Sequence, residues 1–216
     1  MVDESIIEEI VKEGEKTLAE EKKKRKTAEE IRRLLIHTKE RLLSEEEFMY
    51  LLNNVPRNMK NVLMSARKVE HSIAELIDAI ISIALTEGRG APLGTLSTVT
   101  VSYSALIKDF HTILEECKSN NLIDDDTYNK IKEEINKLHG IITTSITRSG
   151  DASKAAVLMI TAIKLFIDLY IYQPAYIIVR DRDKILIKEF AKVLTHNIGT
   201  LGELLERISK YVEVLR

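Results

Sequence analysis

The chain has 216 residues, of which 44% are hydrophobic and 31% are charged, with a formal net charge of −2. This balance is typical of a soluble globular protein and lacks the basic excess of a dedicated nucleic-acid binder. The single cysteine, Cys117, excludes an internal disulfide and a multi-cysteine metal site. Together with an acidic N-terminus that has no secretory signal, it predicts a cytoplasmic protein. Abundant lysine, glutamate and isoleucine beside a single glutamine favour a thermophilic source.

The N-terminal segment is predicted as a charged helical arm. A short apolar stripe occurs at helical spacing, at Ile6, Ile7, Ile10 and Val11. Residues 12–30 then carry mostly charged side chains, with favourable pairs four apart at Glu20 and Lys24 and at Glu21 and Arg25. A helix that is polar all round has little to bury, so this stretch should project from the body of the protein.

Regular apolar spacing returns after residue 30. Ser44 and Glu47 have the spacing of a capping box, which predicts a short helix that stops before Pro56. A long helix is predicted from about Asn58 to Leu85, followed by a glycine-rich loop. We therefore expect a charged arm and short helix over 1–55 and a helical bundle over 56–216, with a hinge at 88–97.

The second half also reads as helical. Residues 98–103 alternate like a strand, but the apolar pattern continues with helical period to Cys117, so a helix is predicted from about Ser97. Asn120 and Asn121 should end it. Acidic residues 124–126 then favour a further helix start, because they face the positive end of a helix dipole.

Residues 155–172 are predicted to form the central helix of the bundle. Nearly all are apolar, and a helix apolar on every face must be surrounded. Lys164 and Asp168 interrupt the run and lie four apart, where they can pair or meet a neighbouring helix. The uncharged pieces on either side are shorter than a membrane span, so none is expected. Gly150 with Asp151 predicts a break and an N-cap, and Gln173 with Pro174 an end or a kink.

The C-terminal stretch 183–215 has the most regular pattern, with apolar residues three and four apart as in a coiled-coil seam. A glycine at position 199 leaves open whether it forms one helix or two. The predicted fold is all-α: a bundle of about six to eight helices with a projecting charged N-terminal helix and a coiled-coil-like C-terminal helix.

Candidate metal ligands are sparse. His71 with Glu75, and His111 with Glu115, each place an imidazole and a carboxylate on one helical face. Di-metal bundles usually carry Glu-x-x-His motifs, which are absent here. We expect no metal site, no cofactor and no catalytic residue, and more generally a protein that is not an enzyme. Cys117 lies beside Glu115 and Glu116, which disfavours an activated thiolate.

Two short motifs resemble parts of enzyme families. Arg32 and His37 have the arginine-x4-histidine spacing of HEPN ribonucleases, which implies a ribonuclease working as a dimer. Residues 75–78, from Glu75 to Asp78, resemble the second half of the metal motif of all-α nucleotide pyrophosphohydrolases, which implies magnesium-dependent chemistry. The earlier Glu-x-x-Glu that those enzymes need is missing, and neither resemblance extends beyond a few residues.

Basic residues in the N-terminal half form the remaining candidate site, for nucleic-acid phosphates. They are Lys22, Lys23, Lys24, Arg25, Lys26, Arg32, Arg33, Arg57, Lys60, Arg67 and Lys68. Glutamates at 20, 21, 29 and 30 flank the first cluster and cancel much of its charge, which favours a solvated, salt-bridged helix over a phosphate-binding site there.

The preferred hypothesis is a cytoplasmic interaction and assembly protein, acting as a homo-oligomer or as a subunit of a larger complex. Its apolar helices are plentiful, whereas convergent polar groups are absent. Association with nucleic acid as a helical accessory protein is the alternative, and a metal-dependent all-α enzyme is a further one.

Overall fold

The computed structural model describes residues 4–84, 93–145 and 149–179, and all of its regular structure is helical. Seven α-helices and one π-helical turn occur in these ranges, and they contain no strand. The predicted all-α bundle with a projecting N-terminal helix is therefore confirmed. The predicted C-terminal helix over 183–215 lies outside the described residues, as does half of the predicted hinge, residues 88–92. The other half, residues 93–97, is helical.

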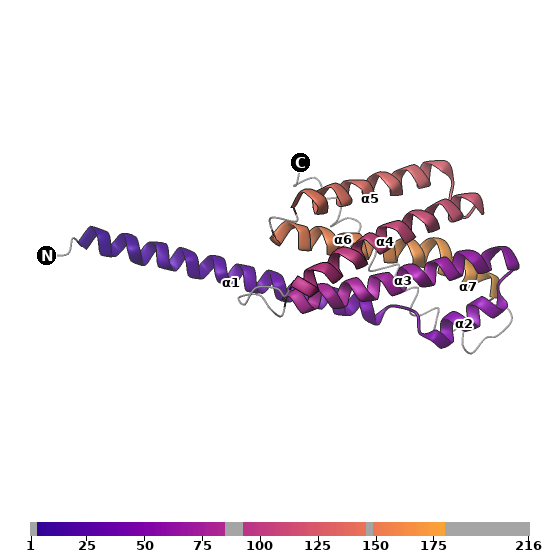
Figure 1. Ribbon diagram of the computed structural model, residues 1–216, viewed down its shortest axis with the longest axis horizontal. Helices are drawn as coiled ribbons and strands as arrows, with labels where there is room; N and C mark the ends of the chain where they lie inside the picture. The colour runs from indigo at the N-terminus through magenta and orange to yellow at the C-terminus, as the bar shows by residue number, and fades with distance from the viewer. Residues whose placement is uncertain (1–3, 85–92, 146–148, 180–216) are drawn as a thin grey trace.

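The first helix, α1 (Glu4–Glu40), is a single helix of 37 residues. Its N-terminal part extends away from the rest of the molecule, and its C-terminal part lies along the bundle (Figure 1). Described side chains are exposed at residues 12, 13, 15–19 and 22, whereas Leu35 is buried. The arm and the first bundle helix are thus one continuous element.

A short helix, α2 (Glu45–Asn54), follows a tight connection, and a long one, α3 (Arg57–Ala84), follows Val55 and Pro56. The predicted capping box is present: Glu47 donates its backbone N–H to Ser44 Oγ, and its carboxylate accepts from the Ser44 backbone N–H at 2.9 Å. The observed bounds of α3 agree with the predicted ones within one residue. Its buried face carries Val62, Leu63, Ala66, Val69, Ile73, Leu76 and Ile77.

Two helices form an antiparallel hairpin on the other side of the bundle (Figure 1). They are α4 (Leu93–Ser119), which packs closely on α3, and α5 (Asp125–Ser145). The alternating stretch at 98–103 is helical, as predicted. Asn121 has φ 56°, a left-handed conformation that asparagine tolerates better than most residues, so it suits the end of α4.

The central segment is continuous from Ser149 to Val179 in three parts: α6 (Ser149–Ile167), the π-helical turn η1 (Asp168–Tyr172) and α7 (Gln173–Val179). The predicted break at Gly150 and Asp151 is wrong, because both lie in the first turn of α6. Amides of a first turn have no partner within the helix, and an aspartate there faces the positive end of the dipole.

An end or a kink was predicted at Gln173 and Pro174; the helix does not end there, and the structure has a π-helical irregularity just before them. Pro174 has no N–H to donate, and a proline ring clashes with the carbonyl four residues before it in an α-helix. The Gln173 N–H reaches the Asp168 carbonyl five residues back, so the turn is widened and the chain remains helical.

The predicted central position of this segment is confirmed. Phe110 of α4 and Phe166 of α6 meet edge to face with centroids 5.5 Å apart in the core. By length and composition, Ala155–Val179 is also apolar enough to cross a membrane, so the two charges do not divide it as the sequence suggested. However, 78% of its most apolar window is buried inside the bundle, as in a core helix.

Candidate functional site

The C-terminal part of α1 is fixed to the bundle by apolar and ionic contacts. Leu35 is 1% exposed and packs within the core. Lys39 Nζ donates to both carboxylate oxygens of Asp78 on α3, at 2.6 and 2.7 Å. These contacts hold the last turns of α1 along α3 and α6, so the direction in which the arm leaves the bundle is set here.

A buried ionic cluster joins α3 to the central segment. Lys164 Nζ of α6 lies 3.0 Å from Glu70 Oε1 of α3 and 2.6 Å from Asp168 Oδ1 of η1. The hydroxyl of Tyr172 donates to Glu70 Oε2 at 2.9 Å. All four residues are at most 3% exposed. Because Asp168 and Tyr172 both belong to the π-helical turn, the cluster also fixes that turn against α3.

Arg67 extends the cluster to the connection between α1 and α2. Its Nη1 lies 3.0 Å from Glu70 Oε2 and donates to the Leu43 carbonyl at 2.7 Å, and its Nη2 lies 2.9 Å from Glu45 Oε2. The Leu43 backbone N–H in turn donates to Glu70 Oε1 at 3.4 Å. Both polar backbone groups of Leu43 are thus bound to the cluster, three residues beyond the end of α1. We define Arg67, Glu70, Lys164, Asp168 and Tyr172 as the anchor cluster.

The anchor cluster is charged but internally neutral. Burial alone would lower the pKa of Lys164, but the charges of Asp168 and Glu70 outweigh it and raise that pKa. Burial, followed by the charge of Glu70, raises the pKa of Tyr172 well above its ordinary value. Lys164 is therefore cationic and Tyr172 neutral around pH 7, and two cations face two carboxylates.

Four members of the anchor cluster, all except Arg67, are enclosed by the core. Its chemistry is structural: it holds α3, the π-helical turn and the start of α2 in one arrangement. The sequence predicted that Lys164 and Asp168 pair with each other or meet partners on a neighbouring helix, and the structure shows both kinds of contact. The buried position of Glu70 was not predicted from the sequence. Its carboxylate lies at helical spacing among Ala66, Ile73 and Ile77 on the apolar face of α3, and this spacing could have indicated the burial.

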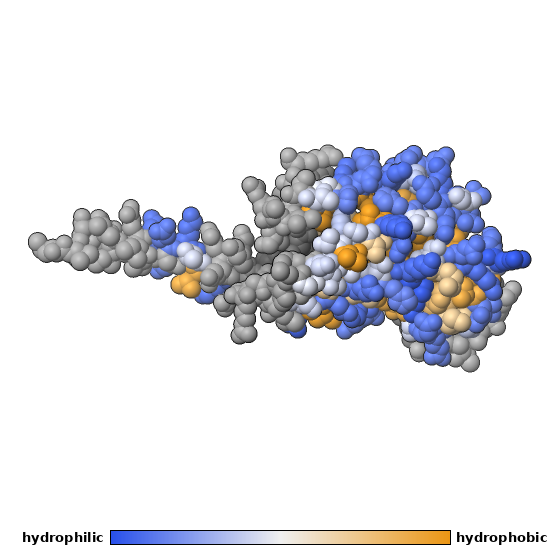
Figure 2. Space-filling model, in the orientation of Figure 1, coloured by the Kyte–Doolittle hydropathy of each residue, from blue (hydrophilic) through white to orange (hydrophobic). Residues whose placement is uncertain are grey.

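The anchored arm is the other distinctive feature of the described chain. The side chain of Leu18 on this arm is 58% exposed, and among the described large hydrophobic residues only Val101 is more exposed. Figure 2 shows its described surface as mostly hydrophilic with a small hydrophobic area. Helices in proteins gain most of their stability from tertiary packing, so a long helix that extends beyond its own bundle is suited to bind another surface.

The described members of the predicted basic set lie in different surroundings. Lys22 is exposed on the arm, Arg33 is paired with Glu29 at 3.3 Å, and Arg67 is 15% exposed in its side chain and bound within the anchor cluster. Arg57 and Lys68 are exposed on α3, whereas Arg32 and Lys60 are half-buried. The side chains of Lys23, Lys24, Arg25 and Lys26 lie outside the described residues. The nucleic-acid site stays a prediction. Arg67 binds Glu45, Glu70 and the Leu43 carbonyl within the protein.

In the motifs that resemble enzyme families, His37, Glu75 and Asp78 are exposed, whereas Arg32 is half-buried. His37 is exposed, lies near Glu40 and contacts Arg41. Asp78 is bound to Lys39, and Glu75 is exposed on α3. His71 is exposed too, and Glu115 accepts a hydrogen bond from the Tyr128 hydroxyl. The described residues contain no cluster of three or more histidine, cysteine, aspartate or glutamate side chains that could hold a metal ion.

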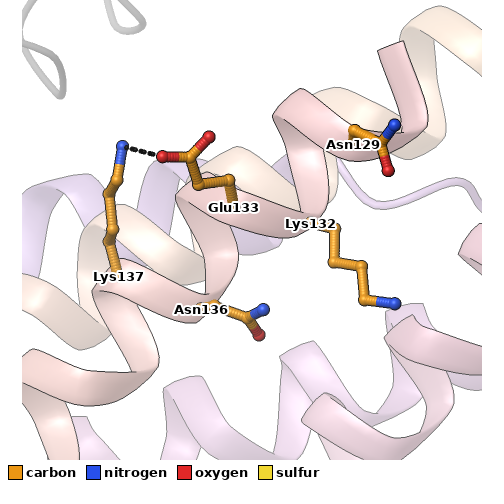
Figure 3. A pocket seen from close by; sticks show the side chains of 5 residues that line it. All are labelled: Asn129, Lys132, Glu133, Asn136 and Lys137. Atoms are coloured by element: carbon orange, nitrogen blue, oxygen red, sulfur yellow. Dashed lines mark ion pairs between the residues drawn. The ribbon is translucent and has the colours of Figure 1, made fainter. Parts of the chain in front are cut away.

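An open hollow runs along α5 (Figure 3). Its described lining consists of Asn129, Lys132, Glu133, Asn136 and Lys137, all from one helix. Lys137 is paired with Glu133 at 3.0 Å, and Lys132 donates to the Tyr128 hydroxyl at 3.0 Å. Because both cations are already engaged and the hollow is open to solvent, its lining provides no convergent set of groups for a ligand.

Cys117 is fully buried, and this burial, followed by the charge of Glu116, raises the pKa of its thiol to about 12. We expect the native protein to react with a thiol reagent at pH 8 at least about 100-fold more slowly than the unfolded chain, because only the exposed thiolate is nucleophilic. The absorbance of the coloured thiolate that a chromogenic disulfide reagent releases measures the rate for the native protein without denaturant and the rate for the unfolded chain with it. Equal rates would contradict the buried position.

Comparisons with known proteins give no family for this chain. No protein-family model matches it. No curated protein matches it significantly, and neither does a solved structure. The class that the fold defines is an all-α helical bundle, and the function must be argued from the bundle itself.

Proposed function

We propose that the protein is a cytoplasmic assembly protein that associates through the α1 arm, with itself or as a subunit of a larger complex. The arm carries the proposal: it leaves the bundle as a helix, and Leu18 is 58% exposed on it. A flexible tail would lose more conformational entropy on binding than a helix that is already formed. The contacts of Leu35, Lys39 and Leu43 with the bundle support this role, because they hold the base of the arm.

The test is the mass of the full-length protein in solution, measured by light scattering over a range of concentrations. We expect a multimer that dissociates on dilution. Leu18→Glu should weaken self-association at least about tenfold. The helix–helix contact would lose the apolar burial of the leucine, and the new carboxylate would have to be desolvated. Val101→Glu is the matched control, since Val101 is 66% exposed but belongs to α4 and not to α1, and this variant should behave like the parent protein.

A strict monomer at high concentration would contradict self-association. Equal weakening by both variants would contradict the role of the arm.

Nucleic-acid association, the alternative function, is supported by the exposed Lys22 at the start of the basic run on the arm. A titration with DNA and RNA at two salt concentrations tests it, and we expect no binding that weakens with salt. Salt-dependent binding in the monomeric state would favour the alternative.

A further inference from the structure

The arm has an uneven distribution of charge along its length. Residues 4–14 contain four glutamates and one lysine, a net charge of −3. Residues 22–32 contain six lysine or arginine residues and two glutamates, a net charge of +4. We call these ranges the acidic and the basic segment. Leu18 lies midway between them, so the arm is a rod with opposite charges at its two ends.

From this arrangement we infer that two copies of the protein associate through their α1 arms side by side and antiparallel, centred on Leu18. In this register the acidic segment of one arm lies beside the basic segment of the other, at both ends of the contact. A parallel pair would place like charges together at both ends, which disfavours it. The inference rests on the proposed function and adds the partner, a second copy of this chain, and its orientation.

The shape of the molecule agrees with this orientation. The bundle is at the C-terminal end of the arm (Figure 1), so antiparallel arms place the two bundles at opposite ends of the contact. At 1.5 Å per residue, the 29 residues from 4 to 32 span about 44 Å, which leaves the bundles well separated. Parallel arms would bring both bundles to the same end, where they would compete for space.

The sequence of the arm supports a contact with a small apolar centre. Leu18 of one arm meets Leu18 of the other at the two-fold axis in this register. Ile7, Val11 and Arg25 lie eleven, seven and seven residues from Leu18, close to whole turns of a helix. A helix position occupied by a long basic side chain can still cover apolar surface with its methylene stem. Charge therefore sets the orientation, and the centre supplies apolar burial.

Engineered disulfides test the orientation in the full-length protein. Positions 7 and 29 are each eleven residues from Leu18, on opposite sides, so they face each other across antiparallel arms. The variants are Ile7→Cys, Glu29→Cys and the chain that carries both changes. Within one arm the two positions are about 33 Å apart, too far for an internal disulfide. The native Cys117 is buried, and the parent protein gives the background.

We expect mild oxidation to link the double variant, and an equimolar mixture of the single variants, into covalent dimers, while each single variant alone stays unlinked. Linking of the single variants alone would show parallel arms and overturn the inference. A multimer by light scattering with no linking in any sample would overturn it as well, while leaving self-association standing. A monomer throughout would remove the proposed function along with it.

Charge reversal tests the cause of the orientation. Changing Lys22, Lys24 and Lys26 to glutamate should weaken self-association at least about tenfold, since both ends of the pair would then be acidic. Changing Glu8, Glu9 and Glu13 to lysine in the same chain should restore it, because opposite charges face each other again. Helix content by circular dichroism controls for folding. Failure of the combined variant to recover would contradict the charge pairing.

Discussion

Replacing Glu70 by alanine is expected to lower the free energy of unfolding by about 3–5 kcal/mol. The change removes the acceptor for Lys164, Arg67, Tyr172 and the Leu43 backbone N–H. Removing one partner of a buried ion pair leaves a charge in the core without compensation, which costs more than the pair contributes. Domains of this kind are stable by about 5–15 kcal/mol, so the variant should lie close to its unfolding threshold. Urea unfolding followed by circular dichroism measures the difference.

The matched control is Glu75→Ala on the same helix, where the carboxylate is exposed and the expected change is within about 0.5 kcal/mol. A loss below about 1 kcal/mol for Glu70→Ala would contradict the described cluster. Replacing Glu70, Lys164 and Asp168 together by apolar residues of similar size should recover much of the lost stability, because no uncompensated charge remains among the three. In the single variant, hydrogen exchange of the Leu43 amide should speed up, since that N–H has lost its acceptor.

Leu63→Ala should destabilise the protein by about 2–5 kcal/mol, because Leu63 is 0% exposed and the deleted side chain leaves a cavity in a closely packed core. The neighbouring residue provides the control. Met64 is 47% exposed on the same turn of α3, so Met64→Ala should change the free energy of unfolding by no more than about 0.5 kcal/mol.

The two variants, Leu63→Ala and Met64→Ala, test how α3 is rotated about its own axis, since adjacent residues of a helix point about 100° apart. Thermal and urea unfolding of both variants beside the parent protein give the comparison. Equal losses at the two positions would contradict the described buried face of α3. A larger loss at Met64 than at Leu63 would mean that α3 presents a different face to α4 and α6.

The sequence by itself determined the helical elements and the centre of the bundle. Apolar spacing of three and four identified α3, and the continuous apolar run identified the central segment, because the period of an α-helix is a local property of the chain. The capping box of Ser44 and Glu47 and the pairing of Lys164 with Asp168 were also readable, since each joins residues within one turn. The mostly charged stretch at residues 12–30 likewise predicted a helix that projects from the bundle.

Only the tertiary structure decided which distant groups meet. Glu70 and Lys164 are 94 residues apart, and no local pattern specifies that their helices pack with those two positions in contact. The inward position of Arg67 also depends on Leu43 and Glu45 being brought to it by the connection between α1 and α2. The sequence placed Arg67 on a basic surface because spacing gives the face of one helix but not its neighbour. The direction of the arm also follows from long-range contacts. The packing of α1 against α3 and α6 ends near residue 31, and α1 continues as a helix on the N-terminal side of that residue.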